Sequence, residues 1–203
     1  MNAGTMPVPT VDTNYLRRLS ELPTELALQQ AVPFLVRLVN DPGFFEGEIR
    51  PVLEEARGAE GDWYVAHSYG GEDHTYSLQV FIWPPSTETK IHDHSTWGVY
   101  CCAVGSVLEE RYERLDDGSR LDHARLKKIQ QRMWSKEDGA SSVLPHDGGI
   151  HRVGNPGDDA DLGAPVRTSA GGGGRSGLRP LLRLRLSPAR GLDRLIDSLC
   201  PRI

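Results

Sequence analysis

Short segments with a two-residue hydrophobic period fill the middle of the chain and restrict its fold more than any other feature. They are rich in aromatic and β-branched residues, which favours strands. Gly-Gly, Pro-Pro and Asp-Asp-Gly sequences lie between them and favour turns. Many short strands at close spacing predict a closed β-barrel or a sandwich. The predicted strands are residues 63–67, 76–83, 99–104, 107–112 and 142–144.

The residues before this region follow a helical period instead. Apolar side chains recur at three- and four-residue steps between residues 28 and 39, and again between 45 and 53. Pro33 interrupts the first run, so one kinked helix and two short helices are both open. We expect a flexible leader, a helical segment and a β-barrel core, at residues 1–10, 11–58 and 59–160.

The charge balance and the few cysteines exclude several classes of protein. The 203 residues carry a formal net charge of -5, which argues against nucleic acid as the main partner. The longest mostly apolar run, residues 97–108, is far shorter than the roughly 20 residues of a membrane-spanning helix. No signal peptide is visible, and three cysteines do not make a disulfide framework. We expect a soluble, cytoplasmic protein that binds neither nucleic acid nor membranes.

The C-terminal segment has a different composition from the rest of the chain. Residues 162–203 hold 8 Arg, 2 Asp and no Lys, a net charge of +6, and they contain no His and no aromatic residue. Residues 1–161 hold 26 acidic and 15 basic residues, a net charge of -11. We therefore set residues 161–203 apart from the barrel core as an atypical, Arg/Gly/Leu-rich tail.

Three histidines form a candidate metal site. His92 and His94 are two residues apart, so on a strand both imidazoles point to the same side, while Asp93 points away. A Pro and a Gly-Gly turn precede His151, which offers a third ligand. Neutral imidazole suits Fe, Cu, Ni and Zn better than Ca or Mg. The alternatives are that His92 and His94 are surface residues, or that His146 replaces His151.

The two histidine segments resemble the paired metal motifs of the cupin superfamily. More narrowly, residues 77–112 resemble the core of the cysteine dioxygenase family of thiol dioxygenases. The hallmarks are a strand that ends in Trp83, the sequence Ile91-His92-Asp93-His94, the Trp97-Gly98 pair after it, and Gly105 before the next strand. The resemblance implies a mainly β fold, a double-stranded β-helix (cupin barrel) with N-terminal α-helices.

The same resemblance implies an activity. His92, His94 and His151 would hold Fe(II) without a carboxylate ligand, and a small thiol would be oxidised by O2 to its sulfinic acid. The rival interpretation is a non-catalytic metal-binding cupin, or one that acts on a substrate other than a thiol. The acidic pair Glu109-Glu110 is expected to be solvated.

Substrate recognition departs from the pattern of this family. In the family an Arg or Gln two residues after a Tyr binds the substrate carboxylate, whereas here Tyr64 is followed by Ala66 at that position. A bulge could turn His67 inward, another residue could bind the substrate, or the substrate could be neither an amino acid nor a mercapto acid. His67 could equally be a surface residue. The candidates for the substrate pocket are Tyr64, His67, Trp83 and Trp97.

The tail lacks a second element of the family, a strand with the pattern Ser-x-His-x-Tyr. One hypothesis is that the tail is read out of frame. With free choice of synonymous codons, residues 161–171 shifted by one base can read ISAHLYGPRL, which contains that pattern. The alternative is a genuine basic tail, in which residues 182–186 alternate Leu and Arg like a strand. Such a tail could replace a lost edge strand or dock on an acidic partner.

Overall fold

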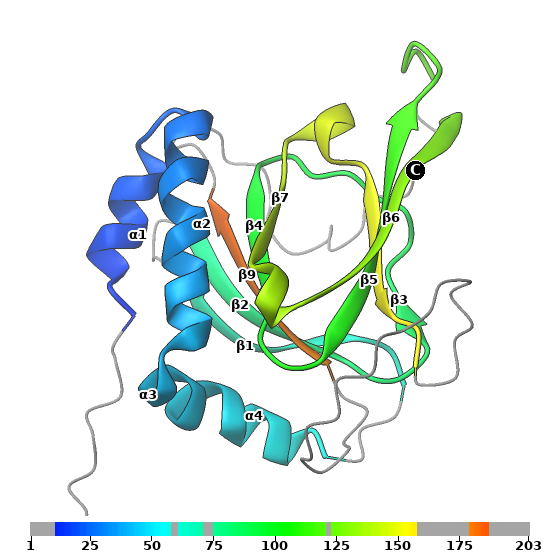
Figure 1. Ribbon diagram of the computed structural model, residues 1–203. Helices are drawn as coiled ribbons and strands as arrows, with labels where there is room; N and C mark the ends of the chain where they lie inside the picture. The colour runs from blue at the N-terminus through cyan, green and yellow to red at the C-terminus, as the bar shows by residue number, and fades with distance from the viewer. Residues whose placement is uncertain (1–10, 58–60, 71–74, 121–122, 158–178, 187–203) are drawn as a thin grey trace, which may run out of the picture.

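Helices cover one face of a two-sheet β-barrel in the computed structural model of the chain (Figure 1). The predicted leader, residues 1–10, lies outside the described residues. So does the part of the tail in which a shifted frame would restore the Ser-x-His-x-Tyr pattern. The described residues are 11–57, 61–70, 75–120, 123–157 and 179–186, the last range by its backbone alone.

The N-terminal region is helical, as its period predicts. Asp12 begins the first helix by accepting a hydrogen bond from the backbone N–H of Tyr15, at 2.9 Å. Pro33 lies inside one continuous helix rather than between two. The elements are α1 (Thr13–Ser20), α2 (Thr24–Asn40), α3 (Pro42–Phe44), the π-helical turn η1 (Phe45–Ile49) and α4 (Arg50–Glu55).

Short strands make up the rest of the described chain. They are β1 (Tyr64–Gly70), β2 (Tyr76–Trp83), β3 (Thr87–Glu88), β4 (Gly98–Cys102), β5 (Ser106–Arg114), β6 (Leu126–Ser135), β7 (Ala140–Val143), β8 (His151–Asn155) and β9 (Arg179–Leu186). Two 3-10 turns lie beside β7, namely η2 (Lys136–Asp138) and η3 (His146–Gly149).

These strands form two antiparallel sheets that face each other. One sheet has the order β1-β2-β9-β4-β7 and the other the order β3-β8-β5-β6. The fold is therefore mainly β, a two-sheet barrel with N-terminal α-helices, as predicted. The C-terminal segment contributes a strand, as the alternation of Leu and Arg predicts. However, β9 is not an edge strand, because it lies between β2 and β4.

Apolar side chains pack on both faces of the five-stranded sheet. Val99 and Cys101 of β4 belong to the layer beneath the helices, together with Leu35 of α2. Tyr100 and Cys102, which alternate with them, belong to a second layer inside the barrel. The helices thus seal the outer face of this sheet, and the barrel interior keeps its own set of aromatic and polar side chains.

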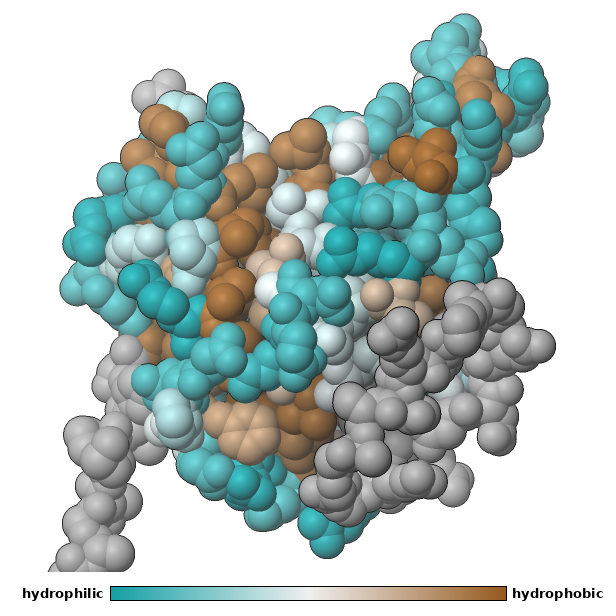
Figure 2. Space-filling model, viewed as in Figure 1, coloured by the Kyte–Doolittle hydropathy of each residue, from teal (hydrophilic) through white to brown (hydrophobic). Residues whose placement is uncertain are grey.

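The sequence pattern did not predict β6. Seven of its ten residues are exposed, and it forms one edge of the four-stranded sheet. Figure 2 shows mostly hydrophilic side chains at the end of the β5–β6 hairpin that projects from the barrel. Because most of β6 is exposed to water on both faces, apolar and polar residues need not alternate along it, and the two-residue period is absent.

Among the described residues, no helix has both the length and the apolar character that crossing a membrane requires.

The Gly-Gly turn before His151 depends on a close backbone approach. A Cβ added at Gly149 would lie 2.0 Å from the carbonyl oxygen of Leu144, which is backbone and cannot rotate away. We expect Gly149→Ala to lower the free energy of unfolding by about 1–3 kcal/mol, the usual cost of overpacking. Chemical denaturation measures this, with Gly70→Ala as the control because its nearest contact is 3.7 Å away. Equal stabilities of the two variants would contradict the prediction.

A buried carboxylate on the outer face of the four-stranded sheet makes stability depend on pH. Burial alone would raise the pKa of Glu110, but hydrogen bonds from Lys128, Tyr112 and Arg152 lower it to about 2. The Lys128 Nζ and Tyr112 Oη atoms lie 2.8 and 2.7 Å from its carboxylate. A lowered pKa stabilises the folded state fully above the unfolded value, and this contribution is lost as the pH falls toward the folded value.

We therefore expect the free energy of unfolding to fall as the pH is lowered from about 5 to 2. Glu110→Gln should flatten that decline, because the amide does not titrate. Urea denaturation at several pH values measures both slopes. Parallel slopes for the variant and the original chain would show that Glu110 does not contribute.

Candidate metal centre

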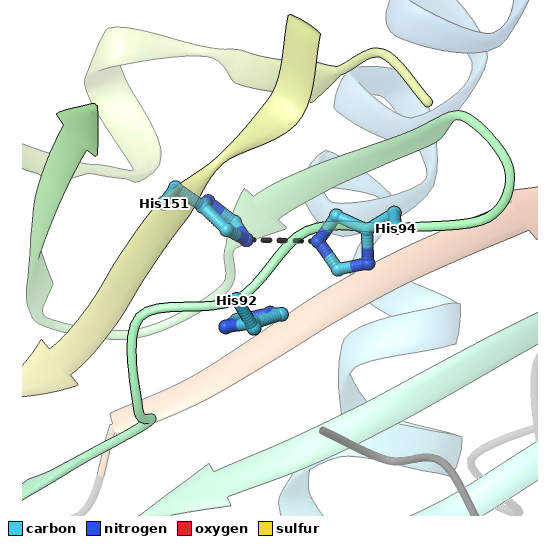
Figure 3. Close-up of side chains that lie close together, drawn as sticks. All are labelled: His92, His94 and His151. Carbon is cyan, nitrogen blue, oxygen red and sulfur yellow. Dashed lines mark hydrogen bonds between the residues drawn. The ribbon is translucent and has the colours of Figure 1, made fainter. Parts of the chain in front are cut away.

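Three buried histidines converge inside the barrel (Figure 3). One ligand atom from each of His92, His94 and His151 lies within 4.8 Å of the other two. His94 Nε2 and His151 Nε2 are only 3.0 Å apart. A transition metal needs imidazole nitrogens that converge on one point in this way.

Two backbone hydrogen bonds bring the histidine segments together. His92 and His151 form an isolated antiparallel bridge, and each N–H donates to the carbonyl of the other at 2.9 Å. His94 follows in the loop that leads to β4, and its carbonyl accepts from the N–H of His146 at 2.6 Å. The predicted strand at His92-x-His94 is thus a single bridge residue and a loop, yet both side chains still reach the cluster.

The outer nitrogens of two imidazoles are engaged by hydrogen bonds. His92 Nδ1 lies 2.8 Å from the carbonyl oxygen of Lys90, which can only accept, so Nδ1 carries the proton. His151 Nδ1 lies 3.1 Å from Tyr100 Oη and 3.3 Å from Glu109 Oε1. Nε2 would then be the ligand atom of His92 and of His151 if a metal binds. Such outer hydrogen bonds fix the tautomer and the ring orientation of metal ligands.

Glu109 is the centre of a buried polar network behind His151. It is 2% exposed, and it accepts hydrogen bonds from Tyr100 Oη and, at 2.9 Å, from Arg111 Nε. Burial alone would raise its pKa, but hydrogen bonds from His151 and Tyr100 and the charge of Arg111 lower it to about 2. Burial, together with the nearby Glu109 charge, raises the pKa of Tyr100 above its usual value. Glu109 is therefore ionised and Tyr100 neutral, and both oxygens can accept the Nδ1 proton of His151.

The donor set fits a divalent transition metal. Three neutral nitrogen ligands suit Fe, Cu, Ni or Zn and leave the full charge of the ion in the site. Among the described residues, no carboxylate joins the His92, His94 and His151 cluster. Glu109 cannot take that role, because it faces the Nδ1 side of His151.

The cluster contains His151, the predicted third ligand, and does not contain His146, the alternative. His146 is exposed in η3, and only its backbone approaches the cluster. Asp93 likewise does not belong to the cluster, as the strand geometry predicted. The two adjacent cysteines are buried and carry free thiols.

Of the four predicted pocket residues, Trp83 is the one that lies inside the barrel. It is 2% exposed and stacks on Trp63 with ring centroids 5.2 Å apart. Its indole Nε1 is buried without a hydrogen-bond partner among the described residues. Trp97 packs in the layer beneath the helices instead, with Leu35 of α2.

Tyr64 and His67 lie on the outer side of β1. Burial and the charge of Glu55, at the end of α4, raise the pKa of Tyr64. A bulge does occur at Ala66, between Val65 and His67, but His67 remains exposed beside Tyr69, with ring centroids 4.4 Å apart. Val65 is the β1 residue that packs against the barrel interior.

The residues that the sequence analysis missed are Tyr100, Glu109 and Arg111. The prediction that Glu109 and Glu110 are solvated is wrong, because they are 2% and 4% exposed. The strand period carried a signal, since Glu109 and Arg111 share the face of β5 on which Val107 is buried inside the barrel. Opposite charges two residues apart on an apolar strand face indicate a buried ion pair rather than a solvated strand end.

No protein-family model and no curated protein matches this chain. Solved structures do. A cupin superfamily protein from Desulfitobacterium hafniense is 12% identical, with a TM-score of 0.40, over 64% of this chain and 81% of that one. Hydroquinone 1,2-dioxygenase PnpCD in complex with Cd2+ and 4-hydroxybenzonitrile is 10% identical, with a TM-score of 0.39. That match covers 67% of this chain and 71% of the dioxygenase chain. Oxalate oxidase in complex with the substrate analogue glycolate is 13% identical, with a TM-score of 0.41. That match covers 65% of this chain and 54% of the oxidase chain. Because these identities are low, the candidate site is identified from the geometry of the histidines and not from the similar structures.

The position of Glu109 behind His151 predicts an effect on metal affinity. We expect Glu109→Gln to weaken the binding of Zn(II) or Fe(II) by roughly 10- to 100-fold, because the neutral amide holds the Nδ1 proton less firmly. Competition with a chromogenic chelator measures the affinity. Glu110→Gln is the matched control, because Glu110 bonds to Lys128 and Arg152 away from the cluster. The same loss in both variants would contradict a specific role of Glu109.

Proposed function

We propose that the chain is a non-haem Fe(II)-dependent thiol dioxygenase that converts a small thiol to its sulfinic acid. The observation that carries the proposal is the convergence of three buried imidazoles, with no carboxylate joining them among the described residues. The resemblance of residues 77–112 to cysteine dioxygenases supports it. In the overall reaction RSH and O2 give RSO2H, so both oxygen atoms end on sulfur and no further oxidant is needed.

The histidines would hold the iron, and the residues around them set its environment. When bound, Fe(II) supplies a positively charged, redox-active centre with open positions for a soft thiolate and for O2. Glu109 and the carbonyl of Lys90 hold His151 and His92 in the tautomer that presents Nε2. Phe81 and Trp83 belong to the buried apolar layer inside the barrel.

Oxygen uptake that depends on an added thiol tests the proposal. The chain is loaded with Fe(II) without oxygen and then given cysteine, 3-mercaptopropionate or cysteamine in aerated buffer. We expect uptake with one of these thiols and the formation of one sulfinate per O2 consumed. His151→Ala should lose both iron and uptake, whereas His146→Ala should keep them, because His146 lies outside the cluster.

Iron bound at one per chain without thiol-dependent uptake would overturn the proposal. The chain would then be a metal-binding cupin that is non-catalytic or acts on another substrate. Retention of iron by His151→Ala would overturn the assignment of the third ligand.

A further inference from the structure

One oxygen of Glu109 serves three side chains inside the barrel. Oε1 accepts hydrogen bonds from Tyr100 Oη and, at 2.9 Å, from Arg111 Nε, and it lies 3.3 Å from His151 Nδ1. The other oxygen, Oε2, accepts from Ser141 Oγ at 3.2 Å. A carboxylate oxygen has two lone pairs, so three donors exceed the capacity of Oε1. The contact with His151 is the longest of the three, which shows which donor is served least.

Tyr100 is the nearer acceptor for the Nδ1–H group of His151. Its Oη lies 3.1 Å from Nδ1, closer than Glu109 Oε1, and it donates its own proton to that oxygen. The Nδ1 proton is thus shared between a neutral phenol and a charged carboxylate. Tyr100 is 2% exposed, and its ring packs on Trp134 with centroids 5.4 Å apart. Packing in the barrel interior therefore holds the hydroxyl beside the histidine.

The hydrogen bond at Nδ1 controls how strongly the other nitrogen of the ring donates to a metal. A carboxylate that holds the Nδ1 proton raises the basicity of the imidazole. Hydrogen bonds to charged groups are also roughly twice as strong as bonds between neutral groups. A more basic imidazole stabilises the higher oxidation state of a metal, so the reduction potential falls. A phenol that takes over part of this hydrogen bond has the opposite effect.

We propose that Tyr100 is a positioning residue that limits the electron donation of His151 and thereby keeps the reduction potential of the metal centre high. The inference goes beyond the proposed function, because it holds for a redox-active metal on the three histidines whichever substrate is oxidised. A high potential favours iron in the divalent form that the proposed function requires.

Tyr100→Phe tests the proposal, because it removes the hydroxyl and keeps both the ring and the net charge. Glu109 retains Arg111 and Ser141 as partners in this variant. The Fe(III)/Fe(II) potential of the iron-loaded protein is measured by spectroelectrochemistry without thiol. We expect it to fall by about 59 mV or more, which is a tenfold gain in the preference for Fe(III) over Fe(II). Outer hydrogen bonds usually change metal affinity by about 10- to 100-fold.

An unchanged or raised potential would overturn the proposal and leave the thiol dioxygenase intact. Conversely, iron that binds without thiol-dependent oxygen uptake would overturn the proposed function alone, because the potential is measured without substrate. A chain that binds no iron would overturn the metal centre and this proposal with it.

Two further variants assign the shift to the hydrogen bond with Glu109. Tyr112→Phe is the matched control, because Tyr112 Oη donates to Glu110 at 2.7 Å on the outer face of β5, and its potential should be unchanged. In a Glu109→Gln background, Tyr100→Phe should shift the potential much less, since the charge that the hydroxyl screens is gone. Equal shifts in the two backgrounds, or a similar shift in Tyr112→Phe, would overturn the proposal.

A spectroscopic measurement on the zinc-loaded protein tests the same hydrogen bond without a redox change. Zn(II) is diamagnetic, so the Nδ1–H proton of His151 gives a resonance that moves downfield as its hydrogen bond strengthens. We expect a downfield shift in Tyr100→Phe and an upfield shift in Glu109→Gln. In the unaltered chain this proton should show a nuclear Overhauser effect to the hydroxyl or ring-edge protons of Tyr100. Its absence would overturn the proposal even if Tyr100→Phe does not fold.

Discussion

The candidate metal centre depends on two backbone hydrogen bonds between His92 and His151. Each is 2.9 Å long, and together they join segments that are far apart in the sequence. Because the bonds use main-chain atoms, both imidazoles remain available for ligation. The close approach of Gly149 to the Leu144 carbonyl sets the path by which the chain enters β8 at this point. Backbone hydrogen bonds thus fix the relative position of the two histidine segments, and the side chains form the site between them.

A second constraint is the cost of polar groups inside a barrel. Glu109, Arg111 and Tyr100 lie among aromatic side chains, and any of them alone would be strongly unfavourable there. They satisfy one another, and the same hydrogen bonds orient His151. The network therefore stabilises the fold and prepares the ligand at once.

The sequence predicted the histidine cluster and most of the fold, for reasons that are local. The period of the apolar residues separates helices from strands. The side chains of His92 and His94 meet as their spacing suggested, although they lie on a bridge residue and a loop rather than on a strand. The exposed strand β6 was not predictable from this period, because neither of its faces is buried along most of its length. The bulge at Ala66 displaces every later β1 residue by one position relative to β2, and an alignment without gaps cannot detect it. Glu109 was misinterpreted because two of its partners, Tyr100 of β4 and Ser141 of β7, are distant from it in the sequence or lie on other strands, so the β5 segment by itself does not show them.

The position of β9 has a consequence for how the chain folds during synthesis. Tyr76 of β2 pairs with Leu186, and β4 pairs with the other side of the same strand. The five-stranded sheet therefore stays open until this late segment has left the ribosome, which adds about 5–20 residues per second. During that interval the facing edges of β2 and β4 present unpaired backbone groups and are sites for aggregation. Pairings of such long sequence separation also form slowly. The backbone edges of β2 and β4 are thus exposed to aggregation during synthesis, whatever the stability of the finished barrel.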